Sequence, residues 1–353
     1  MIAAALLLPI LVACGDPAAP SSGRPTVPAG PGAPIGSANP APGDGAITLT
    51  FGGDVHFVER TLPLLNHPGT AFGPVSKIFS ESDLAMVNLE TAITNRGTPA
   101  PKTYHFRTPP TAYAAVAAAG IDVVTLANNH ALDYGRVGLE DSLNFAESMG
   151  LPIVGAGRNA TEAYRPWITT VKGVKIAVLG FSQVAELWES WAAKDDRPGL
   201  AYAFETARAV AAVKAAKAAA DVVVVYMHWG QEYNQCPTAQ MKTFAKKIAD
   251  AGATMIIGTH AHNLVGDGWM GNTFVQYGLA NFLWWRNDAG SNDTGVLRVT
   301  LSGDKITKTE FLPAYIHRTT GQPIPSTGAE ADRIAKKYAG LHGCTGLASA
   351  PPA

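Results

Sequence analysis

Five short apolar runs along the chain each end in a cluster of Asp, Glu, Asn or His residues. The runs are residues 47–51, 84–87, 123–126, 222–226 and 255–257. Short runs rich in β-branched residues are typical of parallel strands that are buried on both faces. In open α/β sheets the ligand site lies beyond the carboxyl ends of such strands. The pattern therefore predicts five strands whose carboxyl ends meet at one site.

Helical segments alternate with these strands. Pro109-Pro110 opens a helix that runs to Ala119 and stops at Gly120, which follows the preference for proline at helix starts and glycine at helix ends. Further helices are expected at 136–149, 205–219, 237–251 and 328–339. The other apolar runs predict strands at 167–171, 174–179, 273–277, 294–301 and 305–312. Alternating strands and helices with interspersed hairpins predict two packed sheets with helices outside.

Composition excludes several classes of protein. The chain has 353 residues, of which 47% are hydrophobic and 16% charged, and this fits a globular core. Its net charge is −1 with no block of Lys or Arg, which argues against a nucleic-acid partner. Three cysteines exclude a disulfide scaffold and paired thiolate zinc sites.

The first residues are typical of an exported protein. Residues 2–13 form an apolar run that is too short to span a bilayer but fits the core of a signal peptide. Leu11-Val12-Ala13-Cys14 resembles a bacterial lipobox, so we expect a signal peptide over 1–13 and a lipid on Cys14. A plain secretory signal and an uncleaved anchor are the alternatives. Residues 14–45, rich in Gly, Pro and Ala, are expected to be a disordered tether from the outer face of the membrane to the domain.

The clusters at the five strand ends carry nitrogen and oxygen donors without sulfur. Taken alone, each has an ordinary explanation as a turn, a helix cap or a buried histidine. A carboxylate directly after a buried strand is unfavourable unless it is paired or binds metal. Together the clusters predict a metal site for Mn, Fe, Zn or a similar ion, with enough donors for two ions that activate a water.

The order of motifs resembles the calcineurin-like metallophosphoesterase superfamily and, within it, the bacterial CapA-type capsule-synthesis proteins of poly-γ-glutamate formation. The resemblance covers roughly residues 46–315. It is carried by Phe51-Gly52-Gly53-Asp54, Asn88-Leu89-Glu90-Thr91, residues 102–107, residues 126–135, His228-Trp229-Gly230-Gln231-Glu232-Tyr233 and residues 277–282.

The resemblance implies a four-layer α-β-β-α sandwich, which we place over 46–320. The sequence pattern itself predicts a C-terminal helix and tail over 321–353, with the final stretch disordered. The resemblance also implies two divalent metal ions whose ligands are Asp54, His56, Glu90, Asn129, His228, His260 and His262. Glu90 stands where the superfamily has a bridging Asp, and His130 stands at the position of a general acid that does not bind metal. Ala261 replaces the proline usual between the last two histidines.

Several residues beyond the ligands are candidates for substrate contact. Lys102 and Arg107, in the loop after Glu90, are expected to hold an anionic substrate, with a solvated loop as the alternative. Glu232 is also expected to contact substrate. Trp284-Trp285 would be a polymer platform or, more simply, part of the core. Outside the cytoplasm a disulfide between Cys236 and Cys344 is allowed, and the sequence leaves open whether it forms.

Three functions are compatible with these features. The first is a membrane-tethered, metal-dependent hydrolase or transferase acting on an anionic polymer or a phosphoester in capsule metabolism, with other capsule-synthesis proteins as partners. The second is a non-catalytic surface factor that binds or anchors poly-γ-glutamate. The third is a structural metal-binding lipoprotein. Because a structural site needs neither an open position nor an acid, His130 favours chemistry.

Overall fold

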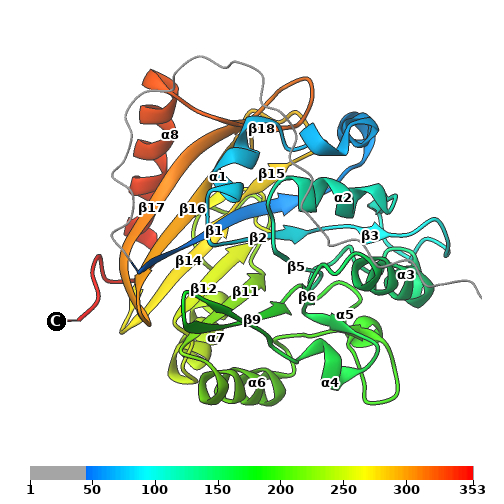
Figure 1. The fold of residues 1–353 in the computed structure, drawn as a ribbon, viewed down its shortest axis with the longest axis horizontal. Helices are drawn as coiled ribbons and strands as arrows, with labels where there is room; N and C mark the ends of the chain where they lie inside the picture. Colours follow the sequence, from blue (N-terminus) through cyan, green and yellow to red (C-terminus); the bar gives the residue numbers. More distant parts are fainter. Residues whose placement is uncertain (1–44, 353) are drawn as a thin grey trace, which may run out of the picture. The chain divides into compact units, whose positions relative to one another are not determined.

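Two β-sheets pack face to face, with α2 (Thr111–Ala118) and α3 (Gly135–Ser148) on one outer side and α6 (Thr206–Ala219) and α7 (Ala239–Asp250) on the other (Figure 1). This computed structural model describes residues 45–352. The predicted signal peptide, Cys14 and nearly all of the predicted tether lie outside the described residues. The predicted four-layer α-β-β-α order is confirmed.

The first sheet has eight strands. Their order is β18-β17-β16-β1-β2-β5-β6, and β15 pairs with β1 beside this path. The central strands β1, β2, β5 and β6 are parallel, whereas β16 runs antiparallel to β1. Their bounds are β1 Ala46–Val55, β2 Leu84–Leu89, β5 Val123–Thr125, β6 Ile153–Val154, β15 Asn281–Leu283, β16 Asp293–Ser302, β17 Lys305–Ile316 and β18 Pro323–Pro325.

The second sheet has six strands in the order β13-β14-β12-β11-β9-β8. Strands β9, β11, β12 and β14 are parallel to one another, whereas the edge strands β8 and β13 pair antiparallel with β9 and β14. Their bounds are β8 Trp167–Val171, β9 Val174–Ser182, β11 Val222–His228, β12 Met255–Thr259, β13 Leu264–Met270 and β14 Thr273–Leu279. All five strands predicted to lead to the site are present as parallel strands.

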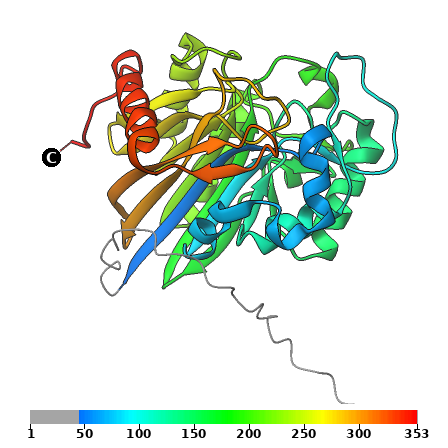
Figure 2. The same ribbon diagram turned by 90° about the horizontal axis from the view of Figure 1, so that it is seen from above.

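Smaller elements complete the chain. Two two-stranded ribbons pair β3 (Ala92–Ile93) with β4 (Arg107–Thr108) and β7 (Ala156–Gly157) with β10 (Gly199–Leu200). The short helices are α1 Ser76–Ser80, α4 Ala160–Ala163 and α5 Trp188–Trp191, with 3-10 turns at Glu59–Asn66, Pro68–Thr70, Gly73–Val75 and Leu341–Cys344. The last helix, α8 (Gly328–Gly340), packs on β17 and β13 (Figure 2).

The strands are apolar at successive positions because both of their faces are buried in the core. In β11, Val222, Val224 and Tyr226 point between the two sheets. The alternate residues Val223 and Val225 pack under α6 and α7. Successive strand side chains point to opposite faces, so a strand covered on both sides is apolar throughout. Full burial of each such side chain contributes about 1.5–3 kcal/mol.

The expectation that the C-terminal tail is disordered is wrong for residues 341–352. Trp269 of β13 and Ala348 exchange two backbone hydrogen bonds, at 2.8 and 3.0 Å. A disulfide joins Cys236 to Cys344 across a Cα–Cα distance of 5.6 Å. A covalent link and strand pairing compensate for the low apolar content from which disorder was predicted. Within residues 45–352 no helix combines the length and the apolar character needed to cross a bilayer.

Replacing both Cys236 and Cys344 by Ser should lower the free energy of unfolding. The link spans 108 residues of sequence, and removing a closed loop of that kind typically costs about 2–4 kcal/mol through the entropy of the unfolded chain. Thermal melting followed by circular dichroism should show a lower Tm with an unchanged far-UV spectrum. Wild-type protein melted with a reductant should shift in the same direction, and an unchanged Tm in the double variant would count against a structural role.

Candidate metal centre

The two sheets bring the predicted donors together at one end of the sandwich. Asp54 lies near the end of β1, where it is in register with Asn88 of β2. His228 is the last residue of β11, and its register partner is Thr259, the last residue of β12. The ends of parallel strands from both sheets therefore face a common space, as the sequence predicted.

Glu90 is the most unusual group in this space. Its side chain is fully buried, and neither carboxylate oxygen has a hydrogen-bond partner. Oε1 lies 3.3 Å from Nε2 of His228 and 3.9 Å from Nε2 of His130. Burial raises the pKa of Glu90 well above its ordinary value. A buried carboxylate without a partner is strongly unfavourable, and a bound cation beside Glu90 would compensate its charge.

Asp54 is the second buried carboxylate. Its Oδ1 accepts a hydrogen bond from Nδ2 of Asn88 at 2.7 Å, and its Oδ2 accepts one from the backbone N–H of His260 at 3.0 Å. Burial, with the charge of Glu90 as the next cause, raises the pKa of Asp54 to about 7. The hydrogen bonds fix the direction of the carboxylate and leave its outer lone pairs facing the same space as Glu90.

The histidines and Asn129 supply neutral donors. Nε2 of His228 lies 2.7 Å from Oδ1 of Asn129. Burial lowers the pKa of His228 to about 4 and that of His262 to about 3, and it lowers the pKa of His260 well below its ordinary value. These imidazoles are therefore neutral, the form in which histidine binds metal.

The donor atoms fall into two groups that share one carboxylate. Ligand atoms of Asp54, Glu90 and His228 lie within 4.8 Å of one another, and so do those of Glu90, His260 and His262. The unpartnered oxygens of Glu90 and an unpartnered, buried Nδ1 on His260 are what a bound cation would satisfy. The residues thus fit a metal site built from nitrogen and oxygen donors.

His56 lies in the wall of the site and in neither of these groups. Its Nε2 accepts a hydrogen bond from the backbone N–H of Trp285 at 3.1 Å. Its ring stacks on Trp284 with centroids 4.1 Å apart and meets the edge of Phe106 at 4.3 Å. Its Nδ1 is buried without a partner. The one nitrogen of His56 that is open to a metal is thus Nδ1.

His130 is held by its neighbours with one nitrogen toward Glu90. Its Nδ1 lies 2.6 Å from Oδ2 of Asp133, and its ring stacks on Phe106 at 4.0 Å. Asp133 also accepts a hydrogen bond from the backbone N–H of Phe106 at 2.6 Å. With Nδ1 bound to a carboxylate, Nε2 is the atom that faces the metal centre, 3.9 Å from Glu90.

The three predicted substrate contacts lie in different environments. Lys102 is only 2% exposed, with Nζ 3.1 Å from Asp133 and 2.9 Å from Glu186. Arg107 is exposed, and its guanidinium packs 4.2 Å above the ring of Tyr134. It is not among the residues that line the opening between the candidate metal donors and solvent. Glu232 lines that opening, with Oε1 3.8 Å from Nε2 of His262. The structure therefore brings Glu232 close to the candidate ligand His262 and places the buried Lys102 in ion pairs with Asp133 and Glu186.

The backbone around the candidate metal centre requires a glycine at position 53 and holds two histidines in the left-handed region. A side chain at Gly53 would meet the carbonyl oxygen of Ala280 at 2.0 Å, so only glycine allows these segments to approach. His260 and His262 have φ of 86° and 55°, in the left-handed region. Such conformations cost of order 1–3 kcal/mol each and cluster at functional sites.

Sequence reasoning assigned no role to the polar residues that orient the donors. Asn128 donates to Oδ1 of Asn88 at 2.9 Å, and Asn88 in turn donates to Asp54. Asn281 places its Oδ1 2.8 Å from Nδ1 of His262. The available signal was an amide side chain at the end of an otherwise apolar strand, as at Asn88, where burial requires a polar partner.

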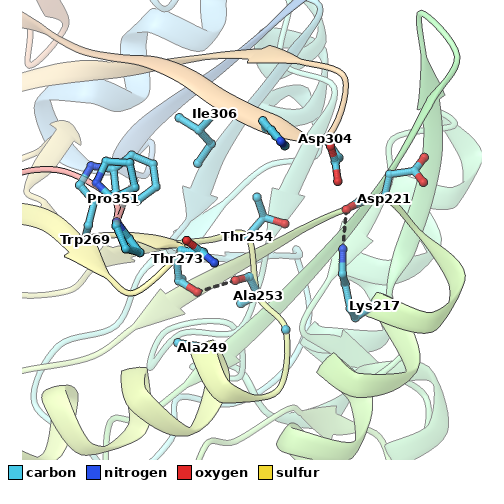
Figure 3. A pocket seen from close by; sticks show the side chains of 14 residues that line it. Lys217, Asp221, Ala249, Ala253, Thr254, Trp269, Thr273, Asp304, Ile306 and Pro351 are labelled. Atoms are coloured by element: carbon cyan, nitrogen blue, oxygen red, sulfur yellow. Dashed lines mark hydrogen bonds between the residues drawn. The ribbon is translucent and has the colours of Figure 1, made fainter.

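A cavity larger than the opening of the site lies elsewhere in the described residues. It has a volume of about 590 Å³ and lies at the amino ends of β11, β12 and β14 (Figure 3). Its lining includes Lys217, Asp221, Thr254, Trp269 and Thr273. Lys217 donates to the backbone carbonyl of Asp221 at 2.8 Å, and none of the predicted site residues lines this cavity.

Comparisons with known proteins point to one family. The family model described as "Bacterial capsule synthesis protein PGA_cap" matches residues 48–284. The chain is 30% identical over 299 residues to the PGA biosynthesis protein CapA of Bacillus subtilis, with 83% of this chain and 78% of that protein covered. It is 29% identical over 288 residues to the capsule biosynthesis protein CapA of Bacillus anthracis, with 79% and 70% covered.

Among solved structures, the fold is similar to that of a hypothetical protein from Thermus thermophilus. The TM-score is 0.50 at 16% identity, with 79% of this chain and 100% of that one covered. At this identity the similarity bears on the fold alone.

Glu90→Ala should lose bound metal, because Glu90 belongs to both donor groups. Metal analysis after loading with Mn²⁺ and desalting should show little metal in the variant and full content in Glu189→Ala, which removes an exposed carboxylate. In chelator, Glu90→Gln should melt no lower than the wild type, because a neutral amide is less costly to bury than an unpaired carboxylate. Full metal content in a folded Glu90→Ala protein would contradict the assignment.

Proposed function

The chain belongs to the bacterial capsule synthesis protein family, and from this premise we propose that it is a metal-dependent hydrolase acting on an anionic polymer of the cell envelope. The observation that carries the proposal is the buried, unpartnered carboxylate of Glu90 with His130 beside it. The carboxylate calls for a cation, and the histidine is an additional group that neither donor group includes. A purely structural site would need no such group.

Two metal ions are proposed, because the donors form two groups that meet at Glu90. Asp54, Glu90 and His228 would hold one ion with Asn129 near it, and Glu90, His260 and His262 would hold the other. Nδ1 of His56, buried without a partner, borders the site as a further donor. Two divalent ions held in this way would supply an activated water and stabilise negative charge at the bond being broken.

The protein's own residues would bind the substrate and move the proton. Asp133 holds Nδ1 of His130, so Nε2 is the atom that would take up a proton and then give it to the leaving group. Lys102 lies 3.1 Å from Asp133 and supports the charge of that carboxylate in a buried position. Phe106 and Trp284 form apolar walls that limit the access of bulk water to the site.

The proposed location is the outer face of the membrane. Leu11-Val12-Ala13-Cys14 and the Gly/Pro/Ala-rich segment after it support a lipid anchor with a spacer. The disulfide between Cys236 and Cys344 also supports export, because such links persist in oxidising compartments.

The second candidate is a surface factor that binds or anchors poly-γ-glutamate without cleaving it. The names of the two Bacillus relatives speak of biosynthesis and fit this role as well. The His130–Asp133 pair favours the hydrolase, because binding a polymer needs no oriented proton donor. Capsule-synthesis proteins are proposed as partners in either case.

His130→Ala should keep metal and fold but lose turnover by about 10²–10⁴-fold, the usual contribution of a positioned acid. The assay is a screen of phosphoesters and γ-glutamyl amides with Mn²⁺, Zn²⁺ or Fe²⁺, with metal content measured on the same samples. Full turnover by the variant on a confirmed substrate would rule out the proton-donor role. No turnover of any class by the wild type with any of the three metals would leave the polymer-binding role as the function.

Cys14→Ala should move the protein from the membrane fraction to the soluble exported fraction. The reason is that a lipidated cysteine would be the anchor, and residues 45–352 contain no helix able to replace it. Fractionation of cells, with mass spectrometry of the N-terminal peptide, measures both consequences. Unchanged fractionation together with an unmodified N-terminal peptide in the wild type would reject the anchor.

A further inference from the structure

A small cavity lies between the start of α6 and one side of α7, separate from the metal centre. It has a volume of about 330 Å³, and we call it the helix pocket. Both helices cover the same outer side of the second sheet (Figure 1). None of the candidate metal ligands or substrate contacts lines this cavity. Its lining includes Gln183, Phe204, Thr206, Gln240, Phe244 and Lys247.

Gln183 is a buried polar side chain of the helix pocket without a partner. It is 8% exposed, and its side-chain amide makes no hydrogen bond to any other residue in 45–352. Along β9 the alternate residues Leu179 and Phe181 pack under α6 and α7, and the period of two in a strand places Gln183 on that side as well. Buried amides are nearly always hydrogen-bonded, so Gln183 takes its partner from the contents of the pocket.

The first turns of two helices border the same cavity. α6 begins at Thr206, and the backbone N–H groups of Thr206 and Ala207 donate to no acceptor among the described residues. The N-cap residue Glu205 supplies no side-chain cap to this helix. The first residues of α7, Ala239 and Gln240, also line the pocket. Unpaired N–H groups of a first helical turn carry partial positive charge and are suited to bind an anion.

The charges around the helix pocket also favour an anion. Lys247 is the charged side chain of its lining, and it is exposed and makes no ion pair within residues 45–352. No Asp or Glu lines the cavity. The carboxylate of Glu205, next to Thr206 in the chain, is compensated by Lys194 at 2.5 Å and Arg208 at 3.5 Å.

The donors around the helix pocket come from three elements. Gln183 follows β9, Lys247 projects from α7, and the free N–H groups belong to α6. A phosphate group offers three strong acceptor oxygens, whereas a carboxylate offers only two. Donors from three directions therefore match phosphate. Phe204 and Phe244 form an apolar wall beside them, suited to the rest of a small molecule.

We propose that the helix pocket binds the phosphate group of a small molecule, held by Gln183, Lys247 and the first N–H groups of α6. Inorganic phosphate and a phosphate monoester share this chemistry. The site is distinct from the metal centre and does not rest on the proposed function.

The test titrates the full exported chain with inorganic phosphate and with phenyl phosphate, using isothermal titration calorimetry. Because a loaded metal centre would also bind phosphate, each titration is run on Mn²⁺-loaded protein and again in chelator. Gln183→Leu and Lys247→Gln each remove one proposed donor. Lys214→Gln is a matched control, because Lys214 is exposed on α6, makes no ion pair within the described residues and does not line the pocket.

In chelator the wild type should bind one phosphate per chain, and Gln183→Leu and Lys247→Gln should each weaken binding roughly tenfold, the scale of a lost charge-assisted contact. Both variants should melt no lower than the wild type, because neither side chain has a hydrogen-bond partner in the protein to lose. Lys214→Gln should bind as the wild type does. The order of the two affinities identifies free phosphate or an ester as the ligand.

Four results would overturn the helix pocket as a phosphate site. The first is wild-type protein that binds neither probe in chelator. The second is an equal loss of affinity in all three variants. The third is binding that requires Mn²⁺ and is unchanged by Gln183→Leu, since such binding belongs to the metal centre. The fourth is benzoate bound as tightly as phenyl phosphate, because a two-oxygen anion would then suffice.

Discussion

The architecture of this protein centres on a carboxylate, that of Glu90, buried where no hydrogen bond reaches it. Placing such a group away from water is costly unless a cation accompanies it. The surrounding groups are compatible with a shared cation: Asp54 is oriented by Asn88 and by the N–H of His260, and His228 is neutral. Without a cation this buried carboxylate is strongly unfavourable, and a cation beside it would remove that cost.

The sandwich makes this arrangement possible because it joins the ends of two parallel sheets. β1 and β2 bring Asp54 and Glu90 from one sheet, and β11 brings His228 from the other. The strained turn after β12 then directs His260 and His262 at the same carboxylates. Strong packing between the sheets offsets the local cost of that turn and of the buried charges. The packed apolar residues and the candidate metal donors therefore lie in different parts of the same strands.

The sequence predicts the strands that carry the site better than it predicts what each side chain does there. Strands such as β11 can be predicted because burial on both faces requires a continuous apolar run, which here ends at His228. The position of Arg107 cannot be predicted in this way, because the residues next to it in the sequence do not determine whether its side chain faces the site. Pairing in β3–β4 places Phe106 against His130 and leaves Arg107 over Tyr134.

The same limit applies to Lys102 and to the C-terminal tail. From the sequence, Lys102 is expected in a loop, either holding an anionic substrate or exposed to solvent. Only the folded chain shows that its side chain is buried and paired with Asp133 and Glu186. The tail reads as disordered by composition, whereas pairing with Trp269 and the Cys344 disulfide hold it. Each of these depends on residues distant in sequence, which local pattern does not encode.

Crystallography of the Mn²⁺-loaded protein with anomalous data tests the central claim most directly. The account predicts two anomalous peaks, one on each side of the Glu90 carboxylate, the first bounded by Asp54 and His228 and the second by His260 and His262. A map with no peak next to Glu90, from crystals of protein shown to be metal-loaded, would contradict the assignment of this carboxylate as the centre of the site.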